Sequence, residues 1–278
     1  MSTPPPIICK EHTLRFEKTL IMGILNVTPD SFSDGGLYNT VDAAVAHAKQ
    51  MVTDGADILD IGGESSRPGS EPLLEAEELA RILPVVTKLV QEVSVPISID
   101  TYKPMVAEKC LKAGAHLIND ITGLTNPKMR KIVATHSVPV IMMHMRGTPK
   151  NMQQNPVYHD VLGEIKIFFQ TQISLAKKTG IQDIIIDPGI GFGKTLEHNL
   201  QILQHLNTFT TLGCPVLVGP SRKSFIGTIT GRPVNERLEG TIAAMTIAIM
   251  NGANIVRVHD VKQCKQAIQV VEAIRGVS

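Results

Sequence analysis

The chain has 278 residues, 43% of them hydrophobic, and 27 basic against 26 acidic residues give a net charge of +1. With no long run of like charge and no tryptophan, the sequence argues against a protein that binds nucleic acid or a membrane surface. The N-terminus lacks the basic and apolar regions of a signal peptide, and the longest apolar stretch, Thr241–Met250, is too short to cross a bilayer. We therefore expect a protein of the cytoplasm.

Residues 1–18 precede the first strand-like run and are expected to form an N-terminal extension or hairpin. After them come eight short apolar runs, each followed by a polar residue or a glycine. A continuous apolar run between turn signals is typical of a strand buried on both faces, as in a parallel sheet. In chain order, the runs and the residues that follow them are Leu20–Leu25 and Asn26, Ile58–Ile61 and Gly62, Pro96–Ile99 and Asp100, His116–Ile118 and Asn119, Val138–Met143 and His144, Ile184–Ile186 and Asp187, Val216–Val218 and Gly219, and Ile255–Val258 and His259.

Helix-like segments separate these runs. Apolar residues recur at helical spacing, and glycines close several of the segments just before the next strand. Alternating strands and helices predict a parallel sheet, and eight such units predict a closed (β/α)8 TIM barrel. The helical patterns are Val41, Val45, Ala48 and Val52; Leu79, Ile82, Val86 and Leu89; and Leu162, Ile165, Phe169, Ile173 and Ala176; the closing glycines are Gly55, Gly114, Gly180 and Gly252.

The whole chain, residues 1–278, is expected to form one α/β domain. Length alone suggests about two domains, but no linker-like stretch interrupts the middle of the chain, and about 250 residues suit a single barrel. A doubly wound open sheet is the alternative. Long polar loops follow the first and second strands, at Asn26–Asn39 and Glu64–Leu73. Their Gly and Pro content suits mobile lids, although plain surface loops are also compatible with it. The end of the second strand is expected mainly to begin such a loop.

Three strand ends carry side chains that suit a ligand rich in N–H donors. Asp100, Asn119 and Asp187 follow the third, fourth and sixth runs, so in a barrel they converge on its C-terminal mouth, where catalytic residues lie. A carboxylate accepts two hydrogen bonds at once, and Asn both donates and accepts. Each residue alone is also compatible with a helix cap or a turn, but the three together favour a site.

Basic residues gather at the seventh and eighth strand ends. Ser221–Ser224 follow the seventh run, and Arg257 and His259 share one face of the eighth. Barrels often bind phosphate between these two loops, and Arg67 in the second long loop is placed to close over an anion there. The tetrapeptide is also compatible with a solvated basic turn.

The segment Asp187–Lys194 is rich in glycine but is neither a P-loop nor a GxGxxG motif. Its glycines let the backbone pass close to a ligand. Phe192 is suited to stack on a ring and Met143 to form a pocket wall, although both are also compatible with ordinary core. His144 has no second ligand at metal spacing, so zinc is not expected. Asn26 offers an oxygen to a hard cation such as Mg2+.

The cysteines are expected to be reduced, structural thiols. They lie far apart, without CxxC or Cys/His metal spacing, as in proteins of a reducing cytosol. The four are Cys9, Cys110, Cys214 and Cys264.

Seven segments, in this order, resemble the dihydropteroate synthase family, and the resemblance covers about Leu20–Ile274. Each segment alone is a weak signal, whereas seven in order are specific. The resemblance implies a (β/α)8 barrel and a transferase of folate biosynthesis. Such an enzyme condenses 6-hydroxymethyl-7,8-dihydropterin pyrophosphate with 4-aminobenzoate to give 7,8-dihydropteroate and pyrophosphate, and it is a sulfonamide target. The segments are Gly23–Gly36 (GILNVTPDSFSDGG), Gly62–Gly69 (GGESSRPG), Ser98–Thr101 (SIDT), Ile118–Asp120 (IND), Asp187–Lys194 (DPGIGFGK), Ser221–Ser224 (SRKS) and Arg257–Asp260 (RVHD).

The resemblance also implies which residues contact each part of the substrates. Those expected to bind the pterin are Asp100, Asn119, Met143, Asp187, Phe192, Gly219 and Lys223. Those expected to bind pyrophosphate are Asn26, Ser66, Arg67, Arg257 and His259, with Asn26 as a ligand of a Mg2+ cofactor. Those expected to bind 4-aminobenzoate are Phe32, Ser66, Arg67, Pro68, Lys223 and Ser224. The expected catalytic residues are Asp100, Asp187 and Lys223.

In the implied reaction pyrophosphate leaves before the amine attacks, so no protein nucleophile is needed. Asp100 and Asp187 would stabilise the pterin cation that forms. Ser66 stands where many members have Thr, which keeps the hydroxyl and is expected to alter sulfonamide fit rather than activity. The resemblance suggests a homodimer, with Thr241–Met250 as a candidate surface; the alternative is that this helix only packs on the barrel.

Two other functions stay open on the sequence alone. A pterin-dependent methyltransferase shares the barrel and the Asp/Asn/Asp pocket, but it has no need for Ser221–Ser224, Arg257–His259 or the Pro29–Phe32 loop segment. A catalytically silent pterin-binding barrel has no need to retain Asn26, Arg67, Lys223 and His259.

Overall fold

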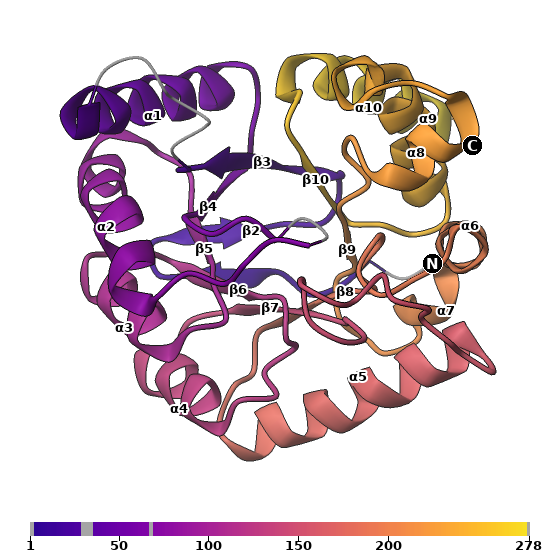
Figure 1. Ribbon diagram of the computed structural model, residues 1–278, viewed down its shortest axis with the longest axis horizontal. Helices are drawn as coiled ribbons and strands as arrows, with labels where there is room; N and C mark the ends of the chain where they lie inside the picture. Colours follow the sequence, from indigo (N-terminus) through magenta and orange to yellow (C-terminus); the bar gives the residue numbers. More distant parts are fainter. Residues whose placement is uncertain (1–2, 29–35, 67–68, 277–278) are drawn as a thin grey trace.

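The computed structural model describes residues 3–28, 36–66 and 69–276. Within them, eight parallel strands alternate with helices that surround the sheet (Figure 1). The strands are β3 (Leu20–Asn26), β4 (Ile58–Gly62), β5 (Ile97–Asp100), β6 (Leu117–Asp120), β7 (Val140–Met143), β8 (Ile184–Asp187), β9 (Leu217–Val218) and β10 (Ile255–Val258). The helices are α1 (Gly36–Thr53), α2 (Glu75–Glu92), α3 (Pro104–Lys112), α4 (Pro127–His136), α5 (Val161–Lys178), α6 (Leu196–Gln204), α7 (Asn207–Thr210), α8 (Ser224–Thr230), α9 (Leu238–Met250) and α10 (Val261–Arg275), with a 3-10 turn, η2 (Val234–Glu236).

The strands close into the predicted barrel. Their order is β8-β7-β6-β5-β4-β3-β10-β9, and an isolated parallel bridge between Ile186 and Val216 joins the two ends of the sheet. At this seam the backbone N–H of Ile186 donates to the carbonyl oxygen of Pro215 over 3.0 Å. The (β/α)8 prediction is therefore confirmed, and the open doubly wound sheet is excluded.

The predicted apolar runs form these strands because both strand faces are covered. Every residue of β4 is buried, as are all residues of β6, β7 and β8, which matches the near-continuous apolar runs of a parallel sheet. The predicted closing glycines lie at the helix ends with positive φ, for example +115° at Gly114. A Cβ at Gly114 would lie 2.7 Å from the side chain of Val90, so this position needs glycine for packing as well as for its backbone.

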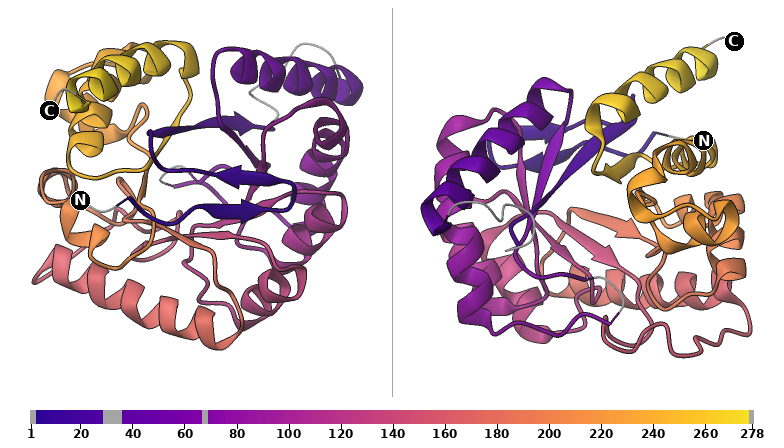
Figure 2. Two further views of the ribbon diagram at one scale, coloured as in Figure 1. Left: turned by 180° about the vertical axis from the view of Figure 1, so that it is seen from behind. Right: turned by 45° about the horizontal axis from the view of Figure 1, so that its top comes forward.

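A two-stranded antiparallel hairpin, β1 (Ile7–Cys9) and β2 (His12–Leu14), lies across one end of the barrel (Figure 2, left). Its apolar side chains form one cluster with residues near the start of the barrel strands. The hairpin therefore closes the end of the barrel opposite the polar strand ends. The cluster consists of Ile7, Cys9, Leu14 and Phe16 with Met22, Ile58, Leu117, Ile141, Ile185, Leu217 and Ile255.

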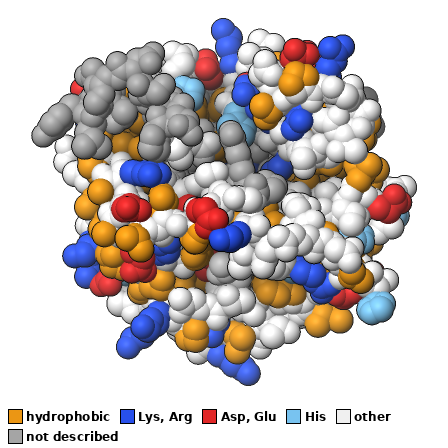
Figure 3. Space-filling view, viewed as in Figure 1, with side chains coloured by type: hydrophobic (Ala, Val, Ile, Leu, Met, Phe, Trp, Pro, Cys, Tyr) orange, Lys and Arg blue, Asp and Glu red, His pale blue; other side chains and the backbone are white. Residues whose placement is uncertain are grey.

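The surface carries charges of both signs. In the view of Figure 3, described Lys and Arg side chains are interspersed with Asp and Glu side chains. In the part of the chain that the structure describes, no helix combines the length and the apolar character that crossing a membrane requires.

Candidate active site

The predicted polar strand ends meet at the C-terminal mouth of the barrel. Asp100 on β5 is the register partner of Asn119 on β6, and Met143 on β7 is the partner of Asp187 on β8. Asn26 ends β3 beside Gly62 of β4. Because all eight strands run the same way, side chains far apart in the sequence share one end of the barrel.

Arg257 lies between two carboxylates at this mouth. Its Nε donates to Oδ2 of Asp60 and its guanidinium NH2 group donates to Oδ2 of Asp100, each over 2.6 Å. The side-chain amide of Asn119 donates to the same Asp60 oxygen over 3.0 Å. One polar group thus links β10, β4, β5 and β6, and it holds the predicted Asp100 and Asn119 in place.

Asp60 is the member of this group that sequence reasoning missed. It is fully buried in the middle of β4, and among the described residues its Oδ1 has no hydrogen-bond partner. Asp60 lies inside β4, and the end of that strand begins a loop at Gly63, as expected. A carboxylate inside the apolar run Ile58–Gly62 was the available signal, because an Asp is rarely buried unless it is paired.

Asp187 begins a loop that folds tightly over the mouth. Its Oδ1 accepts a 2.8 Å hydrogen bond from the backbone N–H of Gly189. Burial raises the pKa of Asp187 to about 6, despite that bond and the nearby charge of Lys223. Gly189 has φ +72°, and a Cβ there would collide with the carbonyl oxygen of His144, which explains a glycine at this point.

Lys194 ends the same loop with its side chain turned inward. Its Nζ donates to the carbonyl oxygens of Phe192 (3.0 Å) and His144 (3.2 Å) and lies 3.1 Å from His144 Nδ1. Burial lowers the pKa of Lys194 to about 7, and burial together with Lys194 keeps the pKa of His144 far below its ordinary value. His144 therefore has the positional role of a neutral hydrogen-bond acceptor.

Lys223 and Phe192 lie against each other near Asp187 and Asp100. The Lys223 ammonium lies 4.0 Å from the centre of the Phe192 ring, a cation–π distance. Burial, reinforced by the charge of Arg257, lowers the pKa of Lys223 to about 8, while Asp187 and Asp100 act in the opposite direction. Phe192 and Met143 belong to one buried apolar cluster with Ile121 and Met152.

The side chains of Ser221–Ser224, after β9, do not all face the mouth. Arg222, at φ +57°, makes a two-point ion pair with Asp260, with hydrogen bonds of 3.0 and 2.5 Å. It therefore joins the loops after β9 and β10 instead of adding a free positive charge at the mouth. Ser224 is the exposed first residue of α8. Gly219 lies against Arg257, whose Cβ would be 3.6 Å from a Cβ at Gly219.

His259 is hydrogen-bonded to Ser221 through both its ring and its backbone. The backbone N–H of His259 donates to Ser221 Oγ over 3.2 Å, and the same Oγ lies 2.9 Å from His259 Nδ1, in a hydrogen bond whose direction depends on the tautomer of the ring. A neutral ring that accepts at Nδ1 carries its hydrogen on Nε2. Burial and then Arg257 lower the pKa of His259 to about 4. The ring is therefore neutral at pH 7, with one N–H to offer.

A hard cation at the mouth would depend on Asn26. Among the described residues, the one group of three His, Cys, Asp or Glu side chains with metal-like spacing is Glu11, His12 and His116, near the hairpin. His116 Nδ1 accepts from the backbone N–H of Ile97 over 3.0 Å, so the neutral ring has its hydrogen on Nε2 and cannot bind a metal there. The amide oxygen of Asn26 fits Mg2+, which binds chiefly through substrate phosphates and water.

Several predicted site residues lie in the long loops. Phe32, Arg67 and Pro68 fall outside the described residues. Ser66 is described and is partly buried at the start of the loop after β4. The predictions for these loop residues, like those for each substrate contact, remain predictions.

Comparison with known proteins places this geometry in a family. Residues 22–259 match the family described as pterin binding enzyme. The chain is 48% identical over 276 residues to a dihydropteroate synthase of Synechocystis, an alignment that covers 98% of this chain and 96% of the relative.

Solved structures agree. A Xanthomonas albilineans dihydropteroate synthase with 4-aminobenzoic acid superposes with a TM-score of 0.94 at 44% identity, covering 99% of this chain and 100% of that one. A structure of the enzyme from the same organism in complex with 7,8-dihydropteroate gives a TM-score of 0.90 at 42% identity, again covering 99% and 100%.

Proposed function

The chain belongs to the pterin-binding enzymes, among the dihydropteroate synthases, and from that premise we propose how its residues divide the reaction. It is a transferase of folate biosynthesis. It condenses 6-hydroxymethyl-7,8-dihydropterin pyrophosphate with 4-aminobenzoate to give 7,8-dihydropteroate and pyrophosphate. The observation that carries the proposal is the convergence of Asp100, Asn119 and Asp187 on one pocket with Lys223 and Arg257.

The pterin ring is proposed to lie among these groups. A pterin presents an amino-pyrimidinone edge whose N–H groups donate, and carboxylates and the Asn amide are matched to it. Phe192 and Met143 supply apolar walls, and Lys223 supplies a donor for a ring carbonyl. Asp60, Asp100 and Asp187 against Arg257 and Lys223 leave one net negative charge when all are ionised. That balance favours a pterin carbon that becomes cationic as pyrophosphate departs.

The pyrophosphate is proposed to meet Asn26, Ser66, Arg67, Arg257 and His259. The neutral His259 ring would donate from Nε2 to a phosphate oxygen, because Ser221 holds its other nitrogen. The guanidinium of Arg257 is already oriented by two carboxylates, so little reorganisation is needed when the charge develops. Asn26 would hold Mg2+, which when bound neutralises part of the leaving-group charge.

The aminobenzoate is proposed to bind above the pterin, against Phe32, Ser66, Arg67, Pro68, Lys223 and Ser224. This assignment rests on the family resemblance together with the positions of Lys223 and Ser224 at the start of α8. Ordering of the two long loops would exclude water before the amine attacks the methylene carbon.

The proposed function is tested by mixing the purified protein with both substrates and Mg2+ and measuring pyrophosphate and 7,8-dihydropteroate. With both substrates the two products should appear in equal amounts, and no 7,8-dihydropteroate should appear without 4-aminobenzoate. Pterin binding without turnover would instead support a silent pterin-binding barrel. Methyl transfer from a methylfolate to a corrinoid protein would support the methyltransferase.

We also propose that the protein is a homodimer joined through α9 and α10. Ile247 and Met250 on α9 are 50% exposed, and Val270 and Ile274 on α10 are 61% exposed. The two helices pack on each other, and α10 lies at the edge of the molecule (Figure 2, right). An apolar face of this kind on adjacent helices suits a self-complementary interface.

A cytoplasmic location is proposed from the cysteines. All four are free and buried. Burial raises the pKa of Cys9, Cys110 and Cys264 to about 12, so these thiols are inert, as suits structural residues in a reducing compartment.

A further inference from the structure

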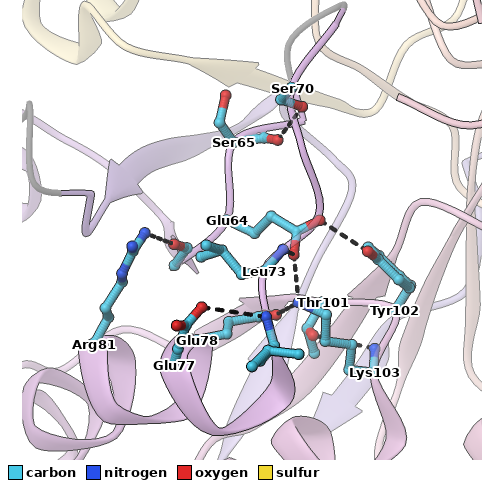
Figure 4. Close-up of polar contacts among 12 residues, drawn as sticks. Glu64, Ser65, Ser70, Leu73, Glu77, Glu78, Arg81, Thr101, Tyr102 and Lys103 are labelled. Carbon is cyan, nitrogen blue, oxygen red and sulfur yellow. Dashed lines mark hydrogen bonds and ion pairs between the residues drawn. The ribbon is translucent and has the colours of Figure 1, made fainter. Parts of the chain in front are cut away.

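A buried ionic cluster lies under the loop between β4 and α2, apart from the groups assigned to the substrates (Figure 4). Lys103 Nζ donates to Oε2 of Glu64, and over 2.5 Å to Oε2 of Glu78. The side chains of Lys103, Glu64 and Glu78 are 8%, 9% and 1% exposed. The hydroxyl of Tyr102 adds a 2.8 Å hydrogen bond to the other Glu64 oxygen.

The charges of this cluster do not require Glu64. Lys103 is one cation facing two carboxylates, so Lys103 and Glu78 alone would form a neutral buried pair. Burial raises the pKa of Glu78 even beside Lys103, as expected where carboxylates outnumber cations. A second carboxylate therefore adds a desolvation cost to the fold, and charge balance does not account for Glu64.

Those contacts hold both ends of the loop. Glu64 lies at the loop's first turn, and its Oε2 also accepts a 2.9 Å hydrogen bond from the backbone N–H of Leu73, nine residues later. One side chain thus joins the two ends of the loop to each other and, through Tyr102 and Lys103, to the turn after β5.

The residues around Glu64 leave the loop base little freedom. A Cβ on Gly63 would lie 2.8 Å from Ile82 of α2. Arg81 donates to the Gly63 carbonyl oxygen over 2.9 Å. Farther along, Gly69 N–H donates to the Pro149 carbonyl oxygen over 3.0 Å. Ser66, two residues after Glu64, therefore extends from a base fixed on several sides.

We propose, resting on the proposed function, that Glu64 is a positioning residue of the synthase reaction: it closes the base of the β4–α2 loop so that Ser66 is presented to 4-aminobenzoate. The pterin pocket does not depend on it, because Asp60, Asn119 and Asp100 are held by Arg257. Loss of Glu64 should therefore weaken the use of one substrate and spare the other.

The test compares Glu64→Ala with Glu64→Gln. In the Ala variant the KM for 4-aminobenzoate should rise about 10-fold, with kcat and the KM for the pterin pyrophosphate changed less than about 3-fold. The Gln variant should recover most of the loss. Its amide oxygen can accept from Leu73 and Lys103 while its NH2 donates to the Tyr102 oxygen, so geometry is kept without the charge.

One affinity measurement and two further variants distinguish a positioning role of Glu64 from a general loss of structure. Affinity for 6-hydroxymethyl-7,8-dihydropterin, measured by calorimetry, should be unchanged in Glu64→Ala. Glu71→Gln is the matched control, because Glu71 lies in the same loop in an exposed pair with Lys150, and it should behave as wild type. Tyr102→Phe, which removes one hydrogen bond to Glu64, should raise the KM for 4-aminobenzoate in the same direction by a smaller factor, and it serves if the Ala variant does not fold.

An unchanged KM for 4-aminobenzoate in the Ala variant, or equal losses for both substrates, overturns the proposal. An active wild type with either result separates this failure from failure of the proposed function, in which the wild type itself would form no 7,8-dihydropteroate.

Discussion

At the scale of single residues, burial at the mouth of the barrel raises the pKa of carboxylic acids and lowers the pKa of a lysine. Asp187 and Asp100 both have raised pKa values because they are buried, and Lys223 has a lowered one. A ligand that supplies hydrogen-bond donors or developing positive charge favours the ionised form of such buried carboxylates. In their ionised forms these buried residues lower the stability of the folded protein.

Asp187→Asn should separate activity from stability. Because burial raises the pKa of Asp187 in the folded state, its ionised form costs the fold free energy near pH 7. The Asn variant should lose at least about 100-fold in kcat/KM, since the charge that favours the pterin cation is gone. Its Tm should stay within about 4 °C of wild type. Matching losses in activity and Tm would contradict the site assignment.

The pH profile of kcat/KM should have two limbs. Asp100 and Asp187, with pKa values raised to about 7 and about 6, become protonated as the pH falls through these values, and Lys223, with a pKa lowered to about 8, loses its proton as the pH rises through 8. Activity should therefore be highest between these values, because kcat/KM reports the free enzyme. Steady-state assays from pH 5 to 9 provide the measurement. An acid limb that persists unchanged in Asp187→Asn would assign it to another group.

Residues of the candidate site were predictable where a polar side chain interrupts or ends an apolar run. Asp100, Asn119 and Asp187 were found in this way, and Asp60 carried the same signal inside β4. The partner of Arg222 was not predictable, because Asp260 lies 38 residues away and only the barrel brings them together.

At the scale of elements, the hairpin covers the end of the barrel core at which the strands begin. Cys9, Leu14 and Phe16 cover inward-facing residues at the starts of the strands. The eight strands themselves were predictable to within two residues at each end, since buried parallel strands read as apolar runs. The docking of β1 and β2 on the barrel was not, because nothing local in a short hairpin indicates the surface that it covers.

Phe16→Ala should therefore destabilise the protein without impairing its chemistry. Phe16 is 6% exposed within the hairpin cluster, and a buried Phe→Ala change costs about 3–5 kcal/mol. Urea unfolding measures this loss, and kcat under native conditions should be close to wild type, because the hairpin is at the opposite end of the barrel from the mouth. Ile8→Ala is the control: Ile8 is 62% exposed, so its loss should be within about 0.5 kcal/mol. A Phe16 loss as small as that of Ile8 would refute the role of the hairpin.

At the scale of the whole molecule, the polar mouth and the apolar α9–α10 face lie on different parts of one barrel. The barrel, its succession of strand–helix units and the polar residues at one end were predictable from the hydrophobic periodicity of the sequence and the order of its elements. The exposed side of α9 was not, because an apolar stretch such as Thr241–Met250 has the same pattern whether a residue faces the barrel, as Met245 does, or solvent, as Ile247 does.

Ile247→Glu should convert the proposed dimer to a monomer. A charge placed in an apolar self-complementary face is unpaired and must be desolvated on association. Sedimentation velocity at several protein concentrations gives the oligomeric state. Ile167→Glu on α5, at a site that is 63% exposed, is the control and should sediment as wild type. A wild type that stays monomeric at high concentration, or an unchanged Ile247→Glu variant, would remove the basis for the interface.

The seam between β8 and β9 is a place where a bound ligand would stabilise the closed barrel. The barrel is closed there by one bridge and a two-residue strand, while Arg257 ties β10 to β4 and β5 on the other side. The proposed pterin contacts come from both sides of that joint, with Asp187 before it and Lys223 after it. A bound pterin would therefore connect the two sides of the β8–β9 seam. It should slow amide hydrogen exchange most at Ile186 and in β9.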